Sequence, residues 1–449
     1  GNHAPLAIGG VLAVQIYTFG SVSGGLFNPA VAFAVLLSGR QKITPRDFLA
    51  YVAAELVGGL LGGCLALLFA DQTFYFDFEK SALQDGGVCC LLELLYTAAL
   101  CIAVLTTGTS SDAPNDYFGF AIGGTVTASA IACGSLDQGS FNPAVTLGIN
   151  VAHLLNSDGV GSPSVASWFL YLFVPFAGSI LGAGVFVLTR GPELRNQAGE
   201  EHSTLEKLIA EGFGTFYLVL TAGIAGGALA PVGVGVMLAV QVYSFGAVSG
   251  ACLNPAVTFA VLLSGRNKIH PLDGFLYMCT QFGAAWLAAA TAWGLTDRTV
   301  QLKETGVGSG LGQEVVFTFA LCMTVLTTAT SRDATNQYFG FAIGGTVTAC
   351  AYAASAHHAG SFNPAVTFGI MLADTCAGTS QAFSSWAVYI VGPWLGGALA
   401  AAVFFLTRRA EYVDEVDSDP LTELAIMING IEERAAGKAP KVETMMSSE

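Results

Sequence analysis

The tripeptide Asn-Pro-Ala occurs four times, and its residue types both start a helix and present hydrogen-bond donors. Proline suits the first helical position, because its missing N–H would have no partner there. Asparagine before it is a good N-cap. An apolar run follows each motif, at 28–38, 142–153, 254–264 and 363–373. These runs are too short to cross a bilayer, so we expect four re-entrant half-helices that enter a membrane and stop. The motif residues are Asn28, Pro29, Ala30, Asn142, Pro143, Ala144, Asn254, Pro255, Ala256, Asn363, Pro364 and Ala365.

Two half-helices that enter from opposite faces would meet with their N-termini at the middle of the bilayer. Their dipoles would place partial positive charge at that point, which opposes the passage of protons and metal cations. The asparagine amides would offer donors to water or to a hydroxyl group. The alternative interpretation is four ordinary capped helix starts, and four matches within repeats argue against it.

Composition indicates a membrane protein. Of 449 residues, 53% are hydrophobic and 11% are charged, against about 25% charged in soluble domains. Mean hydropathy is +0.61. The net charge of −15 argues against nucleic acid as a partner. The sequence holds no Cys/His metal spacing, no phosphate loop and no set of nucleophile and base, so we expect no metal, no cofactor and no enzyme activity.

Eleven stretches are long and apolar enough to be expected membrane spans. They are 5–22, 48–70, 88–108, 117–135, 166–189, 206–228, 230–248, 272–294, 311–329, 338–356 and 384–407. If the polar linker and the tail share one side, 14 of the 17 basic residues lie there. Only Lys80, Arg298 and Lys303 lie opposite. The positive-inside rule then makes the linker and the acidic tail cytoplasmic, in an integral membrane protein whose membrane the sequence does not identify.

The chain is a tandem duplication, and each copy is itself duplicated. Asn254 follows Asn28 by 226 residues in similar surroundings, and Asn363 follows Asn142 by 221. In the second copy an odd number of spans separates the two units, which predicts inverted repeats. Gly1 corresponds to Gly227. We therefore expect a twelfth span, the counterpart of 206–228, upstream of Gly1.

Further residues resemble signatures of the aquaporin (major intrinsic protein) family, and the resemblance covers nearly the whole chain. Ala210-Glu211-Gly-Phe-Gly-Thr-Phe resembles its first-helix signature, and Tyr277-Met-Cys-Thr-Gln281 its third. Glu93 and Glu314 match its fourth-helix glutamate, whereas Glu55 replaces the third-helix glutamine in copy one. The resemblance implies an all-α fold of two right-handed six-helix bundles. It also implies that Glu93, Glu211 and Glu314 brace the re-entrant loops, and a proton relay is the alternative role.

The expected selectivity constriction departs from that of water-selective members, in which arginine follows the second Asn-Pro-Ala. Matching by spacing gives Ile8, Ala130, Gly139 and Val145 in copy one, and Val234, Ala351, Gly360 and Val366 in copy two. This filter is wider and more apolar, and it lacks a fixed cation. We expect a passive channel for water and small neutral solutes such as glycerol, urea, ammonia or hydrogen peroxide. The alternatives are a structural membrane subunit with closed pores and an ion-permeable variant.

The expected organisation is a first aquaporin-like domain at 1–190, a linker at 191–205, a second domain at 206–408 and an acidic tail at 409–449. Because the resemblance implies four barrels per assembly, we expect a homodimer, in contact with membrane lipid. Cys252, two residues before Asn254, should make the copy-two pore sensitive to thiol reagents. His357 and His358 precede Asn363, as solvated loop residues or as a pH-sensing gate.

Overall fold

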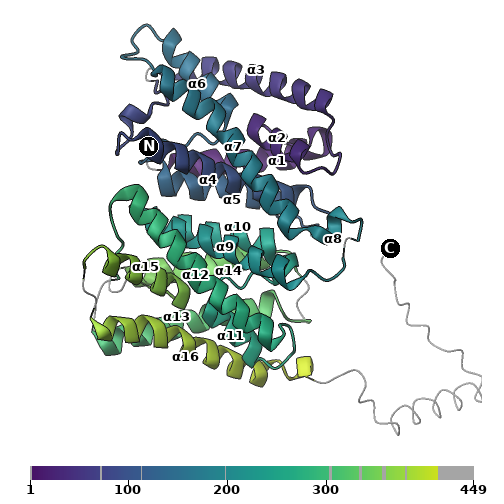
Figure 1. Cartoon of the computed structure of the whole chain (residues 1–449), viewed down its shortest axis with the longest axis vertical. Coiled ribbons are helices and arrows are strands. Elements are labelled where there is room, and N and C mark those ends of the chain that lie inside the picture. Colours follow the sequence, from purple (N-terminus) through teal and green to yellow (C-terminus); the bar gives the residue numbers. More distant parts are fainter. Residues whose placement is uncertain are drawn as a thin grey trace, which may run out of the picture. The chain divides into compact units, whose positions relative to one another are not determined.

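The structure, a computed structural model, describes residues 3–70, 73–112, 114–197, 199–302, 306–332, 336–355, 360–379 and 382–412. Every regular element within these ranges is a helix, so the all-α prediction is confirmed (Figure 1). The chain divides into two units, Gly1–Phe404 and Phe405–Glu449. Both copies of the repeat lie in the first unit. Most of the tail expected at 409–449 lies outside the described residues.

Copy one, the chain before the linker, contributes long helices and two short ones that follow Asn-Pro-Ala. The elements are α1 (Ala4–Ser23), α2 (Pro29–Leu37), α3 (Pro45–Phe69), η1 (Phe78–Lys80), α4 (Gly86–Ala103), η2 (Val104–Gly108), α5 (Phe118–Cys133), α6 (Pro143–Leu155) and α7 (Val165–Thr189). The linker then carries α8 (Gly191–Leu194).

Copy two repeats this order and adds a helix at its start. Its elements are α9 (Thr204–Ile224), α10 (Ala230–Ser249), α11 (Pro255–Leu263), α12 (Pro271–Thr296), α13 (Val307–Thr328), α14 (Phe339–Ser355), α15 (Pro364–Cys376) and α16 (Phe383–Thr407). The turn η3 (Arg409–Tyr412) follows. Each expected span and each expected half-helix therefore coincides with a helix.

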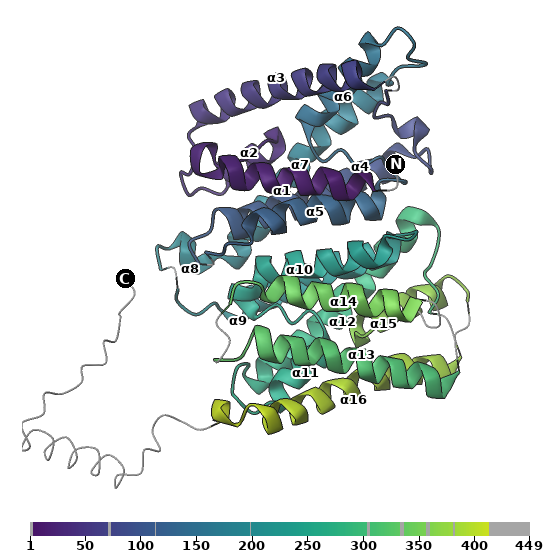
Figure 2. The ribbon, with the colours of Figure 1, turned by 180° about the vertical axis from the view of Figure 1, so that it is seen from behind.

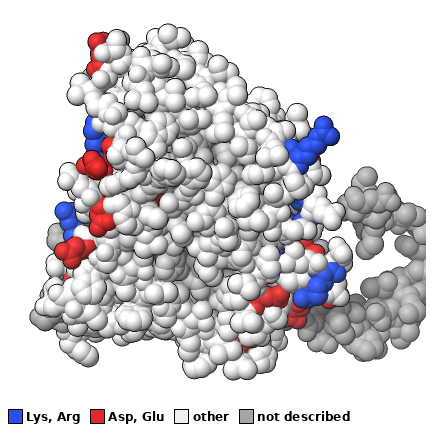
Figure 3. Space-filling model, turned by 45° about the horizontal axis from the view of Figure 1, so that its top comes forward, with Lys and Arg blue, Asp and Glu red and all other residues white. Residues whose placement is uncertain are grey.

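The number of helices that satisfy the criteria of length and composition for a span is smaller than expected. Among the described residues, eight helices are long and apolar enough to cross a membrane, rather than eleven. The helices α5 and α14 have only 16 and 17 residues. The helix α12 has 26 residues but is not among the eight. On the face drawn in Figure 3, charged side chains gather at two opposite edges and leave a wide uncharged surface between them.

The four half-helices begin where the local sequence dictates. Each of α2, α6, α11 and α15 has the motif proline at its first position and the motif asparagine as its N-cap. In all four, the asparagine Oδ1 accepts the backbone N–H of the motif alanine at 2.9 Å. This bond satisfies one of the N–H groups that a helix start leaves without an intrahelical partner.

Small residues let each second half-helix lie directly against a long helix. A Cβ atom added at Gly148 of α6 would lie 2.0 Å from the carbonyl oxygen of Gly59 in α3. One added at Gly63 would lie 2.2 Å from the oxygen of Gly148. In copy two, Gly369 of α15 meets the carbonyl of Ala285 in α12 in the same way, at 2.4 Å. Gly59 and Gly63 of α3 thus serve packing within the bundle, whereas Gly58 and Gly62 face open space.

The two copies pack against each other through α4 and α5 of copy one and α9 and α10 of copy two. The helix α10 runs along α5 (Figure 2). The hydroxyl of Tyr217 in α9 donates to the carbonyl of Leu95 at 3.0 Å. The rings of Tyr117 and Tyr243 stack with centroids 5.6 Å apart. The interface therefore joins different surfaces of the two copies.

A buried group of charged residues, which we call the junction, ties the linker to both copies. Arg190 is fully buried, and its Nη2 donates to the carbonyl of Ser244 in α10 at 2.8 Å. Its Nη1 lies 3.7 Å from Asp112 Oδ2. The ring nitrogens of His202 lie 3.8 Å from Asp112 Oδ2 and 3.7 Å from Glu206 Oε2. The linker is therefore anchored by side chains.

We expect His202 to make the protein less stable in acid. Burial, and then the nearby guanidinium of Arg190, hold the pKa of His202 below its ordinary value. The unfolded chain then binds more protons, so stability contributed by the neutral ring is present above about pH 6.5 and is lost as the pH falls below it. His202→Gln should therefore unfold at a higher temperature than the parent at about pH 5 and at the same temperature near pH 8.

Thermal unfolding of the detergent-solubilised chain at the two pH values measures this difference. His3→Gln is the control, because His3 is an exposed histidine and its side chain makes no cap hydrogen bond. Equal acid sensitivity of the parent and the His202→Gln variant would contradict the prediction.

Candidate functional site

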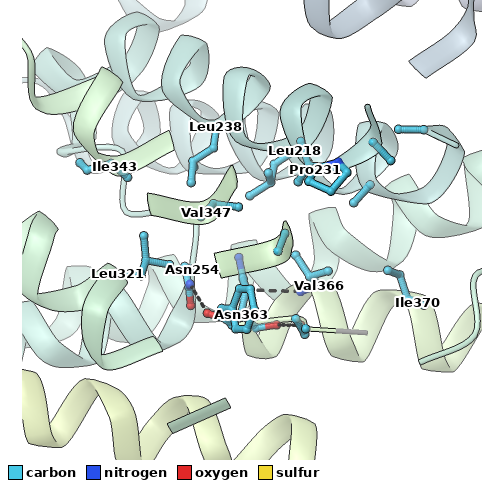
Figure 4. Close-up of a pocket in the computed structure, with 18 of the residues that line it drawn as sticks. Leu218, Pro231, Leu238, Asn254, Leu321, Ile343, Val347, Asn363, Val366 and Ile370 are labelled. Carbon is cyan, nitrogen blue, oxygen red and sulfur yellow. Dashed lines mark hydrogen bonds between the residues drawn. The ribbon is translucent and has the colours of Figure 1, made fainter. Parts of the chain in front are cut away.

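The two half-helices of copy two meet at their asparagines. The Asn254 amide nitrogen donates to the carbonyl of Phe362 at 2.8 Å, and the Asn363 amide nitrogen donates to the carbonyl of Leu253 at 3.0 Å. Each asparagine is thus held by the residue just before the other. Figure 4 shows the pair between Leu321 and Ile343 at one end and Val366 and Ile370 at the other, in a set that lines one cavity.

The half-helices of copy one meet in the same way. The Asn28 amide nitrogen donates to Phe141 O at 2.8 Å, and the Asn142 amide nitrogen donates to Phe27 O at 3.0 Å. Asn28 and Asn142 lie 114 positions apart in the chain. The structure therefore brings together both asparagine pairs of the sequence analysis.

The residue before each asparagine has a left-handed backbone, with φ between 52° and 54°. These residues are Phe27, Phe141, Leu253 and Phe362. Side chains of this size rarely adopt such a φ, which costs of order 1–3 kcal/mol, so the surrounding contacts must hold it. The conformation turns each preceding carbonyl toward the opposite asparagine. Sequence analysis missed this feature, because Phe and Leu give no signal for a left-handed φ.

Buried glutamates hold the loops that carry the second asparagine of each copy. Glu93 accepts the backbone N–H groups of Ser140 at 2.6 Å and Phe141 at 2.8 Å. Glu314 accepts those of Ser361 at 2.7 Å and Phe362 at 2.8 Å. Phe141 and Phe362, whose N–H groups are bound in this way, also supply the carbonyls that accept the asparagine amides. The two carboxylates thus fix the backbone on which the asparagine pairs depend.

The first loop of copy two is held by a third glutamate. Glu211 accepts the N–H groups of Cys252 at 2.9 Å and Leu253 at 2.8 Å. It also accepts the Ser249 hydroxyl at 2.7 Å and the Gln281 amide at 2.8 Å. Glu211 lies in α9 and Gln281 in α12, so these two long helices position the side chains that hold the loop.

Copy one differs at the corresponding position. Glu55 stands where copy two has Gln281. Ala32 stands where copy two has Thr258, whose hydroxyl accepts the Gln281 amide at 3.0 Å. The described residues of copy one thus replace a bonded amide and hydroxyl by a carboxylate and a methyl group.

All four expected filter residues of copy two line one cavity, of about 330 Å³, together with both asparagines. The filter residues are Val234, Ala351, Gly360 and Val366. Leu218 and Ala222 of α9 close one wall, and the other lining side chains are almost all apolar. No Arg, Lys or His is among the described residues that line this cavity.

The corresponding residues of copy one are more open. Ile8 is 53% exposed and Val145 is 42% exposed, whereas Val366 is 9% exposed. Ala130 and Gly139 are half-buried. The described part of copy one contains no counterpart of α9, the helix that covers the copy-two cavity. Copy two is therefore the copy in which the structure gathers the whole expected constriction.

A second cavity, of about 630 Å³, lies on the linker side of copy two. Its lining includes Glu201, Lys207, Lys268 and His270. Cys252 lines both this cavity and the apolar one, so it lies where the two adjoin. The structure thus places Cys252, two residues before Asn254, at both cavities. His357 and His358 lie outside the described residues.

The described residues contain no cluster of three or more His, Cys, Asp or Glu side chains that could hold a metal ion.

A hydroxyl chain that sequence analysis missed supports the second loop of copy one. The hydroxyls of Ser140 and Thr146 lie 2.6 Å apart, and Thr146 donates to the carbonyl of Tyr171 at 3.2 Å. The recurrence of Thr in Asn-Pro-Ala-Val-Thr was the available signal.

Comparison with known proteins agrees with this geometry. The family described as Major intrinsic protein matches residues 2–186 and 199–404. A probable aquaporin NIP-type of Nicotiana alata is 32% identical over 237 residues, 49% of this chain and 82% of that protein. The glycerol uptake facilitator protein-like 6 of Lactiplantibacillus plantarum is 33% identical, over 40% of this chain and 80% of its own.

Aquaporin AqpM of Methanothermobacter thermautotrophicus is 30% identical over 46% of this chain and 99% of its own length. Each relative thus aligns with about one copy, and the family match occurs twice, which confirms the tandem arrangement. These matches show a membrane channel for water or small solutes and not an enzyme. The chain belongs to the major intrinsic protein family.

Proposed function

We propose that this chain is a passive channel for water and small neutral solutes, with one pore in each copy. The solute class is glycerol, urea, ammonia or hydrogen peroxide. The observation that carries the proposal is the asparagine pair of copy two at a cavity whose lining, among the residues that the structure describes, includes no charged side chain.

The asparagines supply the polar contacts along the pore. Each amide nitrogen carries two hydrogens, and a carbonyl of the opposite loop receives one of them. The second hydrogen is then available to an oxygen or nitrogen atom of a passing solute. Because the N-termini of α11 and α15 meet here, partial positive charge repels protons and cations without a fixed arginine.

The four filter residues favour solutes larger than water. Val234, Ala351, Gly360 and Val366 bring no long side chain into the pore. A polyol can place its carbon backbone on this apolar wall and its hydroxyls toward the asparagines. The printed name of the Lactiplantibacillus plantarum relative, a glycerol uptake facilitator, supports the same solute class.

The proposed organisation follows the repeat. Residues 1–190 and 206–408 form the two channel domains, and 191–205 link them on the cytoplasmic side, where the tail from 409 also lies. The motif asparagines and the filter residues line the pores, and Glu93, Glu211 and Glu314 brace their loops.

We also propose that two chains associate into a four-barrel homodimer. Within the chain, α4 and α5 of copy one pack on α9 and α10 of copy two. The equivalent face of copy two, on α13 and α14, exposes Val316, Tyr338 and Phe341. This interface is head-to-tail, because it joins different faces of two barrels. Repeating the same contact between two chains would close four barrels into a ring. The mass of the solubilised assembly measures this directly.

Proteoliposome swelling with a solute panel, combined with current recording, tests the function. We expect water, glycerol and urea to permeate and no ionic current to flow. A strictly water-selective result would contradict the proposed solute class. A cation current would instead support the ion-permeable variant, and swelling no faster than in empty vesicles would support a structural subunit.

A further inference from the structure

A segment that the Asn-Pro-Ala motifs do not include also lines the copy-two cavity. Residues 299–302, which we call the lip, follow α12 and contribute Val300 and Leu302 to the cavity lining. Gln301 between them is exposed, whereas Leu302 is 6% exposed. This alternation is typical of an extended segment, which directs every second side chain to the same face.

A hydrogen bond joins the lip to the second half-helix. The Thr299 hydroxyl donates to Asp374 Oδ1 at 2.5 Å, and Asp374 is fully buried. On α15, Val366, Ile370 and Asp374 are spaced four residues apart, so they share one helix face. Val366 belongs to the expected filter and Ile370 lines the cavity. Asp374 therefore holds the lip about one helical turn, roughly 6 Å, beyond the last lining residue of α15.

Copy one joins the corresponding two positions by a hydrogen bond in which histidine replaces aspartate. Thr73 precedes Thr299 by 226 residues and His153 precedes Asp374 by 221, the two offsets of the duplication. The Thr73 hydroxyl lies 2.8 Å from His153 Nδ1. The corresponding lip residues are aromatic: Phe74 is 55% exposed and Phe76 packs on Tyr171. The two copies thus keep the attachment and change the side chains that it positions.

We propose that the lip determines the solute specificity of the copy-two pore. Val300 and Leu302 set the width and polarity of its entrance, and the Thr299–Asp374 hydrogen bond is the positioning element that holds them there. This inference rests on the proposed channel function. The lip, which precedes α13, thus adds Val300 and Leu302 to the four filter residues that line the pore.

The test compares permeability ratios of lip variants of the full chain in proteoliposomes. For a Val300→Ala/Leu302→Ala variant, the ratio of erythritol to water permeability should rise at least about threefold, because shortening both side chains widens the entrance. Leu302→Val is a milder second variant and should shift the ratio in the same direction. Gln301→Ala is the matched control, because its side chain points outward, and should leave the ratio unchanged.

The positioning role is tested at Thr299. Thr299→Val removes the hydroxyl at nearly constant volume and should raise the same ratio, whereas Thr299→Ser keeps the hydroxyl and should restore the parent ratio. A contact that only stabilised the fold would lower the amount of folded protein without changing the ratio. Parent-like ratios for both variants would overturn the positioning role.

Blocking the copy-two pore separates this inference from the function on which it rests. In a Val366→Trp background, or in Val234→Trp as a second block, the lip variants should have no effect. If the block lowers permeation but lip variants in the open pore change nothing, the lip inference is wrong and the channel function stands. If neither block lowers permeation, the proposed copy-two pore is itself wrong.

Discussion

In a Val366→Arg variant, the glycerol permeability of the copy-two pore should fall at least about tenfold, whereas most of its water permeability should remain. Val366 lies in the third position of α15, lines the apolar cavity and is 9% exposed. An arginine side chain would extend into a cavity of about 330 Å³ and narrow it. Proteoliposome swelling in glycerol and in an impermeant osmolyte measures both quantities.

Two further variants give this prediction its controls. Val366→Leu narrows the cavity without adding charge and should reduce glycerol permeation less than arginine does. Val145→Arg makes the same change in copy one and measures how much of the total flux passes there. Unchanged glycerol permeation in the Val366→Arg and Val145→Arg double variant would contradict a filter role for these positions.

A Glu314→Ala variant should abolish permeation through copy two and lower the stability of the chain. The fully buried carboxylate accepts the N–H groups of Ser361 and Phe362. Alanine would leave both donors without a partner, at about 1–3 kcal/mol each. Because the Phe362 carbonyl receives the Asn254 amide, displacement of this loop also removes one half of the asparagine pair. Thermal unfolding in detergent and proteoliposome swelling measure the two effects.

The duplication supplies the matched control for this variant. Glu93 makes the same two bonds in copy one, so Glu93→Ala should leave the copy-two pore intact. In a Val366→Trp background, where copy two is blocked, Glu314→Ala should add no further loss of permeation. Wild-type water permeation by Glu314→Ala protein with both pores open would show that the bracing bonds are dispensable.

Most of the fold followed from hydropathy and from one motif. The spans are visible because a segment in lipid must satisfy its backbone hydrogen bonds internally, which forces long apolar runs into helices. The half-helices are visible because proline at the first position and an asparagine cap fix their starts. The threshold for span length failed at α5 and α14, which have only 16 and 17 residues.

The details of the site depend on contacts between distant residues, which one sequence does not display. Nothing about Leu253 indicates that its carbonyl receives an amide from Asn363, 110 positions away. Burial of Arg190 is equally hidden, because arginine after an apolar span normally reaches water. Of these features, the Thr299–Asp374 bond could most easily have been found from the sequence. The two offsets of the duplication pair Thr299 with Thr73 and Asp374 with His153, so the same two positions are polar in both copies.

The buried guanidinium at the junction makes the fusion difficult to reverse. Gene separation into two single-barrel proteins would leave Ser244 of the second without its donor and expose a socket shaped for an arginine. In the first of the two proteins, Arg190 would stay beside Asp112 but would lose the surface of α10 that helps to bury it. The covalent link thus keeps Arg190 beside the backbone carbonyl that accepts its hydrogen bond.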